Sequence, residues 1–368
     1  MKNKVFFADM RTSANNNLFN KLDLLLEKIG IESRIKKNSL IAVKLHFGER
    51  GNTAFIPPIF VRKIVDKVKQ YEGKPFITDT NTLYSGDRNE AISHLILATH
   101  HGFGYSVIDA PLVIADGIRG NTSVKVRIDK KIFKEVNIGA ELYHADNIIS
   151  VAHFKGHELT GFGGTLKNLG MGGASRQGKL SQHSNISPRV ARRLCKGCGD
   201  CINICPQQAI SLIDGKSKID KEKCIGCAEC INICTQEAIK IQWNETTTNF
   251  QKKMVEHVCG VLKGKEGRAL FINFLMNISP ACDCYGHSDA PIVPNIGILA
   301  STDPVAIDQA SVDLVNQETG IRNSALKSNF EKGEDKFRGL YPEVDWEIQL
   351  NYAERLGLGF REYKFVQI

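Results

Sequence analysis

Eight of the chain's eleven cysteines lie between residues 195 and 234, where one spacing occurs twice. Each half reads C-x2-C-x2-C-x3-C, and the two sixteen-residue halves are identical at eleven positions. In such a repeat, three cysteines of one tight loop and the fourth cysteine of the other half ligate one cluster. The spacing therefore predicts two 4Fe–4S clusters of the bacterial ferredoxin type, one on Cys195, Cys198, Cys201 and Cys234, the other on Cys224, Cys227, Cys230 and Cys205.

Other readings of this repeat fit less well. Structural zinc also uses four cysteines, but its sites favour paired C-x2-C units over two tandem runs of four. The N-terminus lacks the long apolar region of a signal peptide, which predicts a cytoplasmic protein whose thiols stay reduced rather than forming disulfides. Thr235 stands where the first half has Pro206, a departure from the usual motif that removes no ligand.

A second thiol group lies outside the repeat, at Cys282-x-Cys284-x2-His287. Two thiols and an imidazole at this spacing could bind a soft or borderline metal. The same thiols could instead form a redox dithiol, or be buried structural thiols in a loop. Cys259 falls on the apolar face of an expected helix and is interpreted as a core residue.

Polar residues also follow five of the expected strands, at the place where open α/β sheets build their sites. We expect one shared cleft that contains Cys282 and Cys284 and is lined by residues able to bind an anionic substrate or move protons. The candidates are Lys44, His46, Glu49, Asp79, His153, Lys155, His157, Asp283, His287, Asp289 and Asp303.

The glycine-rich stretch 160–175, TGFGGTLKNLGMGGAS, precedes the cysteines. It matches neither the G-x-x-x-x-G-K-[ST] phosphate loop nor G-x-G-x-x-G. Lys167 and Asn168 could still contact an anion through a loop of exposed amides, and a tightly turning loop is the alternative. An additional metal or a flavin is possible without any fingerprint for either.

The elements around these residues alternate between strand and helix. Such a βαβα order predicts an α/β fold with a largely parallel sheet covered by helices. Expected strands cover residues 5–9, 40–47, 75–79, 147–154, 269–279, 296–301 and the terminal YKFVQI, with short apolar runs at 106–109 and 112–116. Expected helices cover about 18–29, 57–68, 90–99, 250–263, 305–317 and 346–356.

The cysteine repeat interrupts this pattern. We expect residues 1–185 and 251–368 to form one discontinuous α/β body, with a boundary near Ile186. Residues 186–243 would be an inserted α+β lobe of the bacterial ferredoxin kind, and NETTTNF (244–250) a polar linker. Insertions of this type are tolerated at exposed loops.

Charge and hydropathy exclude some classes of partner. The 368 residues carry a formal charge of +8, and two clusters of about −2 each would reduce it to about +4. No arginine-rich or aromatic-interleaved basic run favours nucleic acid. No stretch approaches the roughly 20 apolar residues of a membrane helix.

Three segments resemble the iron–sulfur proteins of the domain of unknown function 362 family: LTGFGGTLKNLGMGGASRQGKLSQH (159–183), ISPACDCYGHSDAPIVPNIGILASTDPVAIDQ (278–309) and the cysteine repeat. The resemblance implies this architecture and two clusters, and no particular reaction. The leading hypothesis is an oxidoreductase whose clusters pass electrons to a substrate or metal in the cleft. The alternatives are a ferredoxin-like electron carrier or maturation factor, and a metal-dependent non-redox enzyme with structural or sensing clusters.

An electron-transfer role requires a redox partner protein. We expect an acidic one, flavodoxin-like or ferredoxin-like, because basic residues gather beside the first cysteine of the repeat. These are Arg189, Arg192, Arg193 and Lys196.

Overall fold

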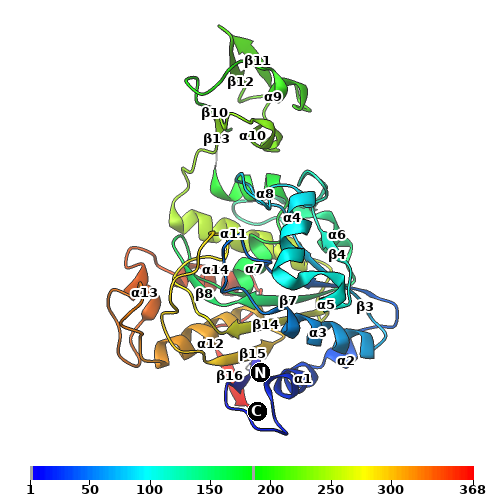
Figure 1. The fold of residues 1–368 in the computed structure, drawn as a ribbon, viewed down its shortest axis with the longest axis vertical. Coiled ribbons are helices and arrows are strands. Elements are labelled where there is room, and N and C mark those ends of the chain that lie inside the picture. The colour runs from blue at the N-terminus through cyan, green and yellow to red at the C-terminus, as the bar shows by residue number, and fades with distance from the viewer. Residues whose placement is uncertain (1–2, 185–186) are drawn as a thin grey trace.

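A computed structural model describes residues 3–184 and 187–368. Its centre is an eight-stranded sheet with the order β16-β1-β15-β14-β7-β2-β3-β4 (Figure 1). The strands are β1 (Asn3–Asp9), β2 (Leu40–Lys44), β3 (Lys74–Asp79), β4 (Leu112–Ile114), β7 (Asn147–His153), β14 (Ala269–Leu275), β15 (Gly297–Ser301) and β16 (Tyr363–Gln367). Strands from both sides of the cysteine repeat share this sheet, since β14 pairs with β7.

The sheet is mostly parallel, as predicted. Neighbouring strands from β4 to β14 all pair in parallel, so the carboxyl ends of β2, β3, β7 and β14 share one edge. In contrast, β15 runs antiparallel to both β14 and β1. Its carboxyl end therefore lies at the opposite edge.

Both faces of the sheet are covered. β7 is buried along its whole length, as expected for a strand that is covered on two sides. Its consecutive residues Ile148 and Ile149 belong to two different apolar cores, one for each face. One core includes residues of α7 (Thr165–Gly170), α11 (Thr247–Leu262), α12 (Pro304–Gln317) and α14 (Glu347–Arg355), and the other includes residues of α1 (Leu18–Lys28), α3 (Pro58–Gln70) and α4 (Ala91–Ala98).

Smaller elements connect these layers. Two hairpins are made by β5 (Ser123–Arg127) with β6 (Glu135–Gly139) and by β8 (Lys155–His157) with β9 (Gly161–Gly163). The other helices outside the cysteine repeat are α2 (Ile31–Arg34), the π-helix η1 (Thr99–Phe103), α5 (Tyr105–Ile108), α6 (Ala140–His144), α8 (Arg176–His183) and α13 (Lys336–Leu340). None of the helices in the described ranges combines the length and apolar character needed to cross a bilayer.

The polar stretch predicted to be a linker is partly helical. α11 begins at Thr247, and the hydroxyl of Thr246 accepts a hydrogen bond from the backbone N–H of Asn249 at 3.2 Å. A threonine followed by polar residues is a normal helix start, because its side chain caps a free N–H group. The boundary predicted near Ile186 lies outside the described residues.

Residues 187–243, the cysteine lobe, contribute no strand to the large sheet. In Figure 1 they lie at one end of the molecule, beyond α8. β10 (Arg189–Val190) pairs with β13 (Ile239–Lys240), and β11 (Ile210–Ile213) pairs with β12 (Lys216–Ile219). Two one-turn helices, α9 (Asp200–Asn203) and α10 (Glu229–Ile233), follow the cysteine loops.

Candidate functional site

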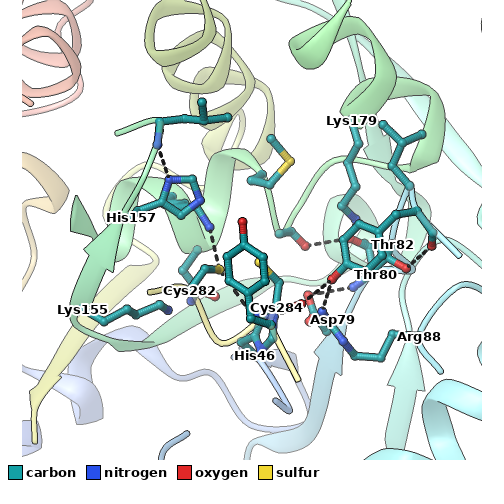
Figure 2. Close-up of a pocket in the computed structure, with 18 of the residues that line it drawn as sticks. His46, Asp79, Thr80, Thr82, Arg88, Lys155, His157, Lys179, Cys282 and Cys284 are labelled. Atoms are coloured by element: carbon teal, nitrogen blue, oxygen red, sulfur yellow. Dashed lines mark hydrogen bonds and ion pairs between the residues drawn. The ribbon is translucent and has the colours of Figure 1, made fainter. Parts of the chain in front are cut away.

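A cavity of about 560 Å³ lies at the edge of the sheet where β2, β3 and β7 end. Trp243 and Tyr285, 57% and 41% exposed, line it, so it opens to the surface. Figure 2 shows Cys282 and Cys284 within this lining, between His157 and Asp79. Predicted residues that the cavity brings together are Lys44, His46, Asp79, His153, Lys155, His157, Lys167, Asn168, Cys282 and Cys284.

Two of the remaining candidates, Asp283 and Glu49, lie outside the cavity lining and contact residues that line it. The Asp283 carboxylate lies 2.9 Å from Nδ1 of His153 and 3.0 Å from Nζ of Lys155, and it is fully buried. Glu49 accepts a hydrogen bond from the Arg88 guanidinium at 3.1 Å. Both carboxylates therefore orient cationic side chains rather than facing a ligand.

Asp303 does not join the cavity, contrary to the prediction. It follows β15, whose antiparallel direction places its carboxyl end at the opposite edge of the sheet. There Asp303 caps α12 by accepting hydrogen bonds from the N–H groups of Val305 and Ala306, both at 2.8 Å. An apolar run predicts a buried strand without predicting its direction.

His287 does not join Cys282 and Cys284 in the lining of the cavity. His287 is exposed and does not line the cavity; its ring lies against Tyr285, with centroids 5.6 Å apart. Asp289 is exposed in the same loop.

Cys282 and Cys284 have opposite protonation preferences. A hydrogen bond from the Cys284 thiol holds the pKa of Cys282 well below its ordinary value, against burial and with help from Lys167. The same hydrogen bond and burial raise the pKa of Cys284 well above its ordinary value. Lys167 Nζ lies 3.3 Å from the Cys282 sulfur, and the Cys284 backbone N–H lies 3.4 Å from it. These neighbours therefore favour the thiolate form at Cys282 and the protonated form at Cys284.

His157 is a further donor to this thiolate. Its Nδ1 accepts a hydrogen bond from the backbone N–H of Leu159 at 3.1 Å, so the ring proton is on Nε2. The ring also hydrogen-bonds to Cys282 and lowers the pKa of that thiol. His46 is fixed in the same way by the N–H of Gly48 at 2.9 Å, and burial keeps its pKa well below the ordinary value.

The other charges of the cavity are largely balanced by ion pairs. Lys44 Nζ lies 3.0 Å from a carboxylate oxygen of Asp79, which also faces Arg88 at 3.8 Å. Burial lowers the pKa of Lys179 to about 8, and this side chain donates to Thr80 and to the Asn81 carbonyl. The cavity floor is thus polar without a large excess of positive charge.

The glycine-rich stretch positions Lys167 instead of forming a phosphate loop. The N–H groups of Thr165 and Leu166, at the start of α7, donate to the Asp308 carboxylate at 2.7 and 2.9 Å. A Cβ at Gly164 would lie 2.3 Å from the same carboxylate. These amides are therefore taken by Asp308 and cannot receive an external anion.

Several lining residues were absent from the predicted set. Tyr84 and Arg88 follow β3 in the same loop as Asp79, so the strand-end rule could have found them. Lys179 and His183 come from α8, in a polar stretch with no apolar periodicity. Burial lowers the pKa of His183 to about 3, and this neutral ring packs between Trp243 and Phe250, with both centroids 4.6 Å away.

The eight cysteines of the cysteine lobe form two groups. Burial and the neighbouring sulfurs of Cys234, Cys195 and Cys198 raise the pKa of Cys201, although Ser217 partly offsets this. Burial and then chiefly Cys227 and Cys224 raise the pKa of Cys230. A second, apolar cavity is lined by the four cysteines of the latter group, Cys205, Cys224, Cys227 and Cys230.

The two halves of the repeat also share backbone features. The Cys205 sulfur accepts the N–H of Ala209 at 3.2 Å, and the Cys234 sulfur accepts the N–H of Ala238 at the same distance. Gly197 and its counterpart Gly226 have φ values of 71° and 70°, which let the loops turn tightly. The loops therefore present donors to sulfur in equivalent ways.

Leu83 connects the two parts of the molecule. It is 3% exposed and lines the cavity at the sheet edge. It also belongs to the apolar cluster of the cysteine lobe, together with Leu180, Cys201 and Cys230. One side chain thus faces the cavity while packing in the core that surrounds the cysteines.

Two solved structures are distantly similar to the chain. The lactate racemase apoprotein from Thermoanaerobacterium thermosaccharolyticum aligns with 13% identity and a TM-score of 0.36, over 75% of this chain and 51% of that one. A Thermotoga maritima protein solved by a structural genomics consortium aligns with 10% identity and a TM-score of 0.38, over 92% and 58%. This chain therefore spans little more than half the length of either protein. No curated protein matches it.

A family match covers most of the chain. The model of the domain of unknown function DUF362 matches residues 41–313. That range contains the strands that end at the cavity, the cysteine lobe, and the loop with Cys282 and Cys284. The match agrees with the resemblance seen in the sequence. The chain belongs to the DUF362 family.

Proposed function

We propose that this protein binds two 4Fe–4S clusters in the cysteine lobe and transfers electrons to a substrate in the cavity of the α/β body. The first cluster would be held by Cys195, Cys198, Cys201 and Cys234, and the second by Cys205, Cys224, Cys227 and Cys230. When bound, such clusters supply one-electron transfer at a potential that burial and hydrogen bonds to sulfur adjust.

The arrangement of the sulfurs supports this cofactor assignment. Four cysteines from both halves line one apolar cavity, which suits a ligand that bridges the two halves. Backbone N–H groups already point at sulfur in both halves. A bound cluster would release the protons of these thiols and offset the repulsion between neighbouring thiolates. These features fit iron–sulfur ligation.

The observation that carries electron transfer into the body is the double role of Leu83. This residue lines the cavity and packs in the same apolar cluster as Cys230 and Cys201. Trp243, the last residue of the cysteine lobe, lines the cavity as well. The proposed donor and the proposed acceptor site are thus in contact through shared side chains.

Metal analysis and spectroscopy of anaerobically purified protein test the proposal. We expect about eight irons and eight sulfides per chain, and paramagnetic signals after dithionite reduction that show two interacting centres. Zinc in place of iron would refute the cofactor. Iron that no low-potential donor can reduce would refute electron transfer and leave cluster binding intact.

A partner surface and a compartment follow from the same proposal. Arg189, Arg192, Arg193 and Lys196 are exposed beside Cys198, which is also exposed. This basic surface suits an acidic redox partner, flavodoxin-like or ferredoxin-like. A cytoplasmic location suits the many unpaired thiols.

A further inference from the structure

The thiols of Cys282 and Cys284 lie in the cavity with unequal surroundings. Cys282 is 1% exposed and receives hydrogen bonds from Lys167, from the backbone N–H of Cys284, and from the His157 ring. The Cys284 thiol is the fourth donor to the same sulfur. The pair thus contains one sulfur prepared as a thiolate and one sulfur that holds a proton beside it.

The third thiol of the α/β body has no such surroundings. Cys259 lies on α11, and burial raises its pKa to about 11. Cys259 is half-buried rather than in the predicted core position, and its thiol keeps its proton at neutral pH, whereas Cys282 has the cationic and hydrogen-bonding neighbours that activate a cysteine. The contrast makes Cys259 a matched control.

We propose that Cys282 and Cys284 are a redox-active dithiol that reduces a small-molecule disulfide in the cavity, with Cys282 as the attacking thiolate and Cys284 as the resolving thiol. Thiol–disulfide exchange needs a thiolate that attacks and a second thiol within reach of it. The second requirement is supported by position, because the two cysteines are separated by one residue, both line the cavity, and the backbone N–H of Cys284 lies 3.4 Å from the Cys282 sulfur. The cavity volume of about 560 Å³ is in the range that holds small molecules.

The reaction balances in two steps. The Cys282 thiolate attacks one sulfur of R–S–S–R′, so that a Cys282–S–S–R bond forms, the R–S–S–R′ bond breaks, and R′–S⁻ leaves with the proton of Cys284. The Cys284 thiolate then attacks the Cys282 sulfur, forms the Cys282–Cys284 disulfide and releases R–S⁻, which takes a proton from water. The substrate gains two electrons, and the dithiol loses two.

The return to the pair of Cys282 thiolate and Cys284 thiol needs two electrons and one proton. Only this return rests on the proposed function, which would supply the electrons one at a time. Lys167 and His157 are positioning residues in this scheme, because they hold the Cys282 thiolate and do not change oxidation state. The first half-reaction can therefore be tested without reducing the protein again.

Peptide mass analysis tests the dithiol directly. Anaerobic protein is mixed with 2-hydroxyethyl disulfide or with oxidised glutathione, quenched in acid, alkylated and digested. We expect an internal Cys282–Cys284 disulfide in the unaltered chain and in Cys259→Ser. In Cys284→Ser we expect a stable mixed disulfide on Cys282, and in Cys282→Ser neither product. Absence of the internal disulfide and of the trapped adduct would overturn the proposal.

Iron content, measured on the same samples, separates this proposal from the previous one. Disulfide exchange without iron would refute the clusters and support the dithiol, whereas about eight irons without exchange would do the reverse.

The role of Lys167 has its own readout. In Lys167→Met we expect Cys282 to react with iodoacetamide about 10-fold more slowly at pH 7, with the midpoint of the pH–rate profile moved upward. Lys167→Arg should restore most of the rate. An unchanged profile in Lys167→Met would show that this lysine does not hold the thiolate.

Discussion

The two groups of cysteines in this protein are held in opposite ways. In the cysteine lobe, the sulfurs have one another, a few backbone N–H groups and the Ser217 hydroxyl as neighbours, and no cationic side chain is hydrogen-bonded to them in the described residues. In the α/β body, the Cys282 sulfur is surrounded by donors from Lys167, His157 and Cys284. Sulfurs that have one another as neighbours suit a metal, and a sulfur beside a cationic side chain is stabilised as a thiolate by the protein alone. Cysteine sulfur therefore suits two kinds of chemistry in this protein.

The cysteine lobe and the α/β body also differ in the size of their apolar cores. The α/β body has a large apolar core on each face of its sheet. The apolar cluster of the cysteine lobe is small, and cysteines are among its members. A unit of this size rarely buries enough apolar surface to be stable without metals or disulfides. We therefore expect the cysteine lobe, and not the body, to depend on its cofactor.

The largest expected effect is that of a cluster ligand. In Cys230→Ala we expect loss of about half of the iron, because one set of four cysteines loses a member. The far-ultraviolet circular dichroism of the body should change little. Iron and sulfide analysis after anaerobic purification measures this, with Cys259→Ala as the control. Full iron retention in Cys230→Ala would contradict the ligand assignment. The contrast between metal-binding sulfurs in the lobe and a thiolate in the body would then fail.

The next effect concerns the body alone. Asp308→Ala removes the acceptor of the Thr165 and Leu166 N–H groups and of the Asn273 side chain. Leaving these buried donors unpaired should lower the free energy of unfolding by about 3 kcal/mol. Thermal unfolding followed by circular dichroism measures the loss, and Asp308→Asn, which keeps one oxygen, should lose less.

Since α7 carries Lys167, Asp308→Ala should also slow alkylation of Cys282 while the iron content stays constant. If Asp308→Ala lost iron but no stability, the result would contradict the prediction that Asp308 stabilises the body alone.

A smaller effect is expected from acid. Burial lowers the pKa of His94 to about 3, and neither ring nitrogen has a hydrogen-bond partner within the described residues. The unfolded chain, with an ordinary pKa near 6.5, binds more protons between these values, so the free energy of unfolding falls as the pH falls. At pH 5.0 this costs about 2 kcal/mol.

His94→Leu should therefore lose less stability than the unaltered chain between pH 7 and pH 5.0. Denaturant unfolding followed by circular dichroism at the two pH values measures the difference. Asp116 and Asp308, whose pKa burial raises to about 6, act in the opposite direction but are present in both proteins. The exposed His287→Leu is the control. Equal acid sensitivity of His94→Leu and the unaltered chain would show that His94 is not held neutral.

The smallest effect concerns the surface of the cysteine lobe. Replacing Arg189, Arg192, Arg193 and Lys196 with alanine should slow electron exchange with an acidic flavodoxin about fivefold and flatten its dependence on salt. Stopped-flow absorbance at several ionic strengths measures both. The substitutions leave the cavity untouched, so disulfide exchange at Cys282 should stay constant. Unchanged rates at all salt concentrations would place the docking surface elsewhere.

Much of the framework was readable from the sequence, because the signals are local. The cysteine spacing predicts two sets of four ligands, each drawn from both halves of the repeat, and this assignment stays a prediction. Apolar runs separated by amphipathic helices predicted the mostly parallel sheet, which is confirmed. The family resemblance is confirmed as well. Polar residues at strand ends pointed to Lys44, His46 and Lys155, which the structure places in one cavity.

Only the tertiary structure decided which of these residues act together. The direction of β15 removes Asp303 from the cavity, and strand direction depends on pairing rather than on the strand's own residues. The thiolate at Cys282 depends on Lys167 and His157, which lie more than a hundred positions earlier in the chain. A charge on sulfur is a property of its neighbours in space. The sequence by itself determined which sulfurs the chain has and how they are spaced, and folding determined which of them has a lysine as its neighbour.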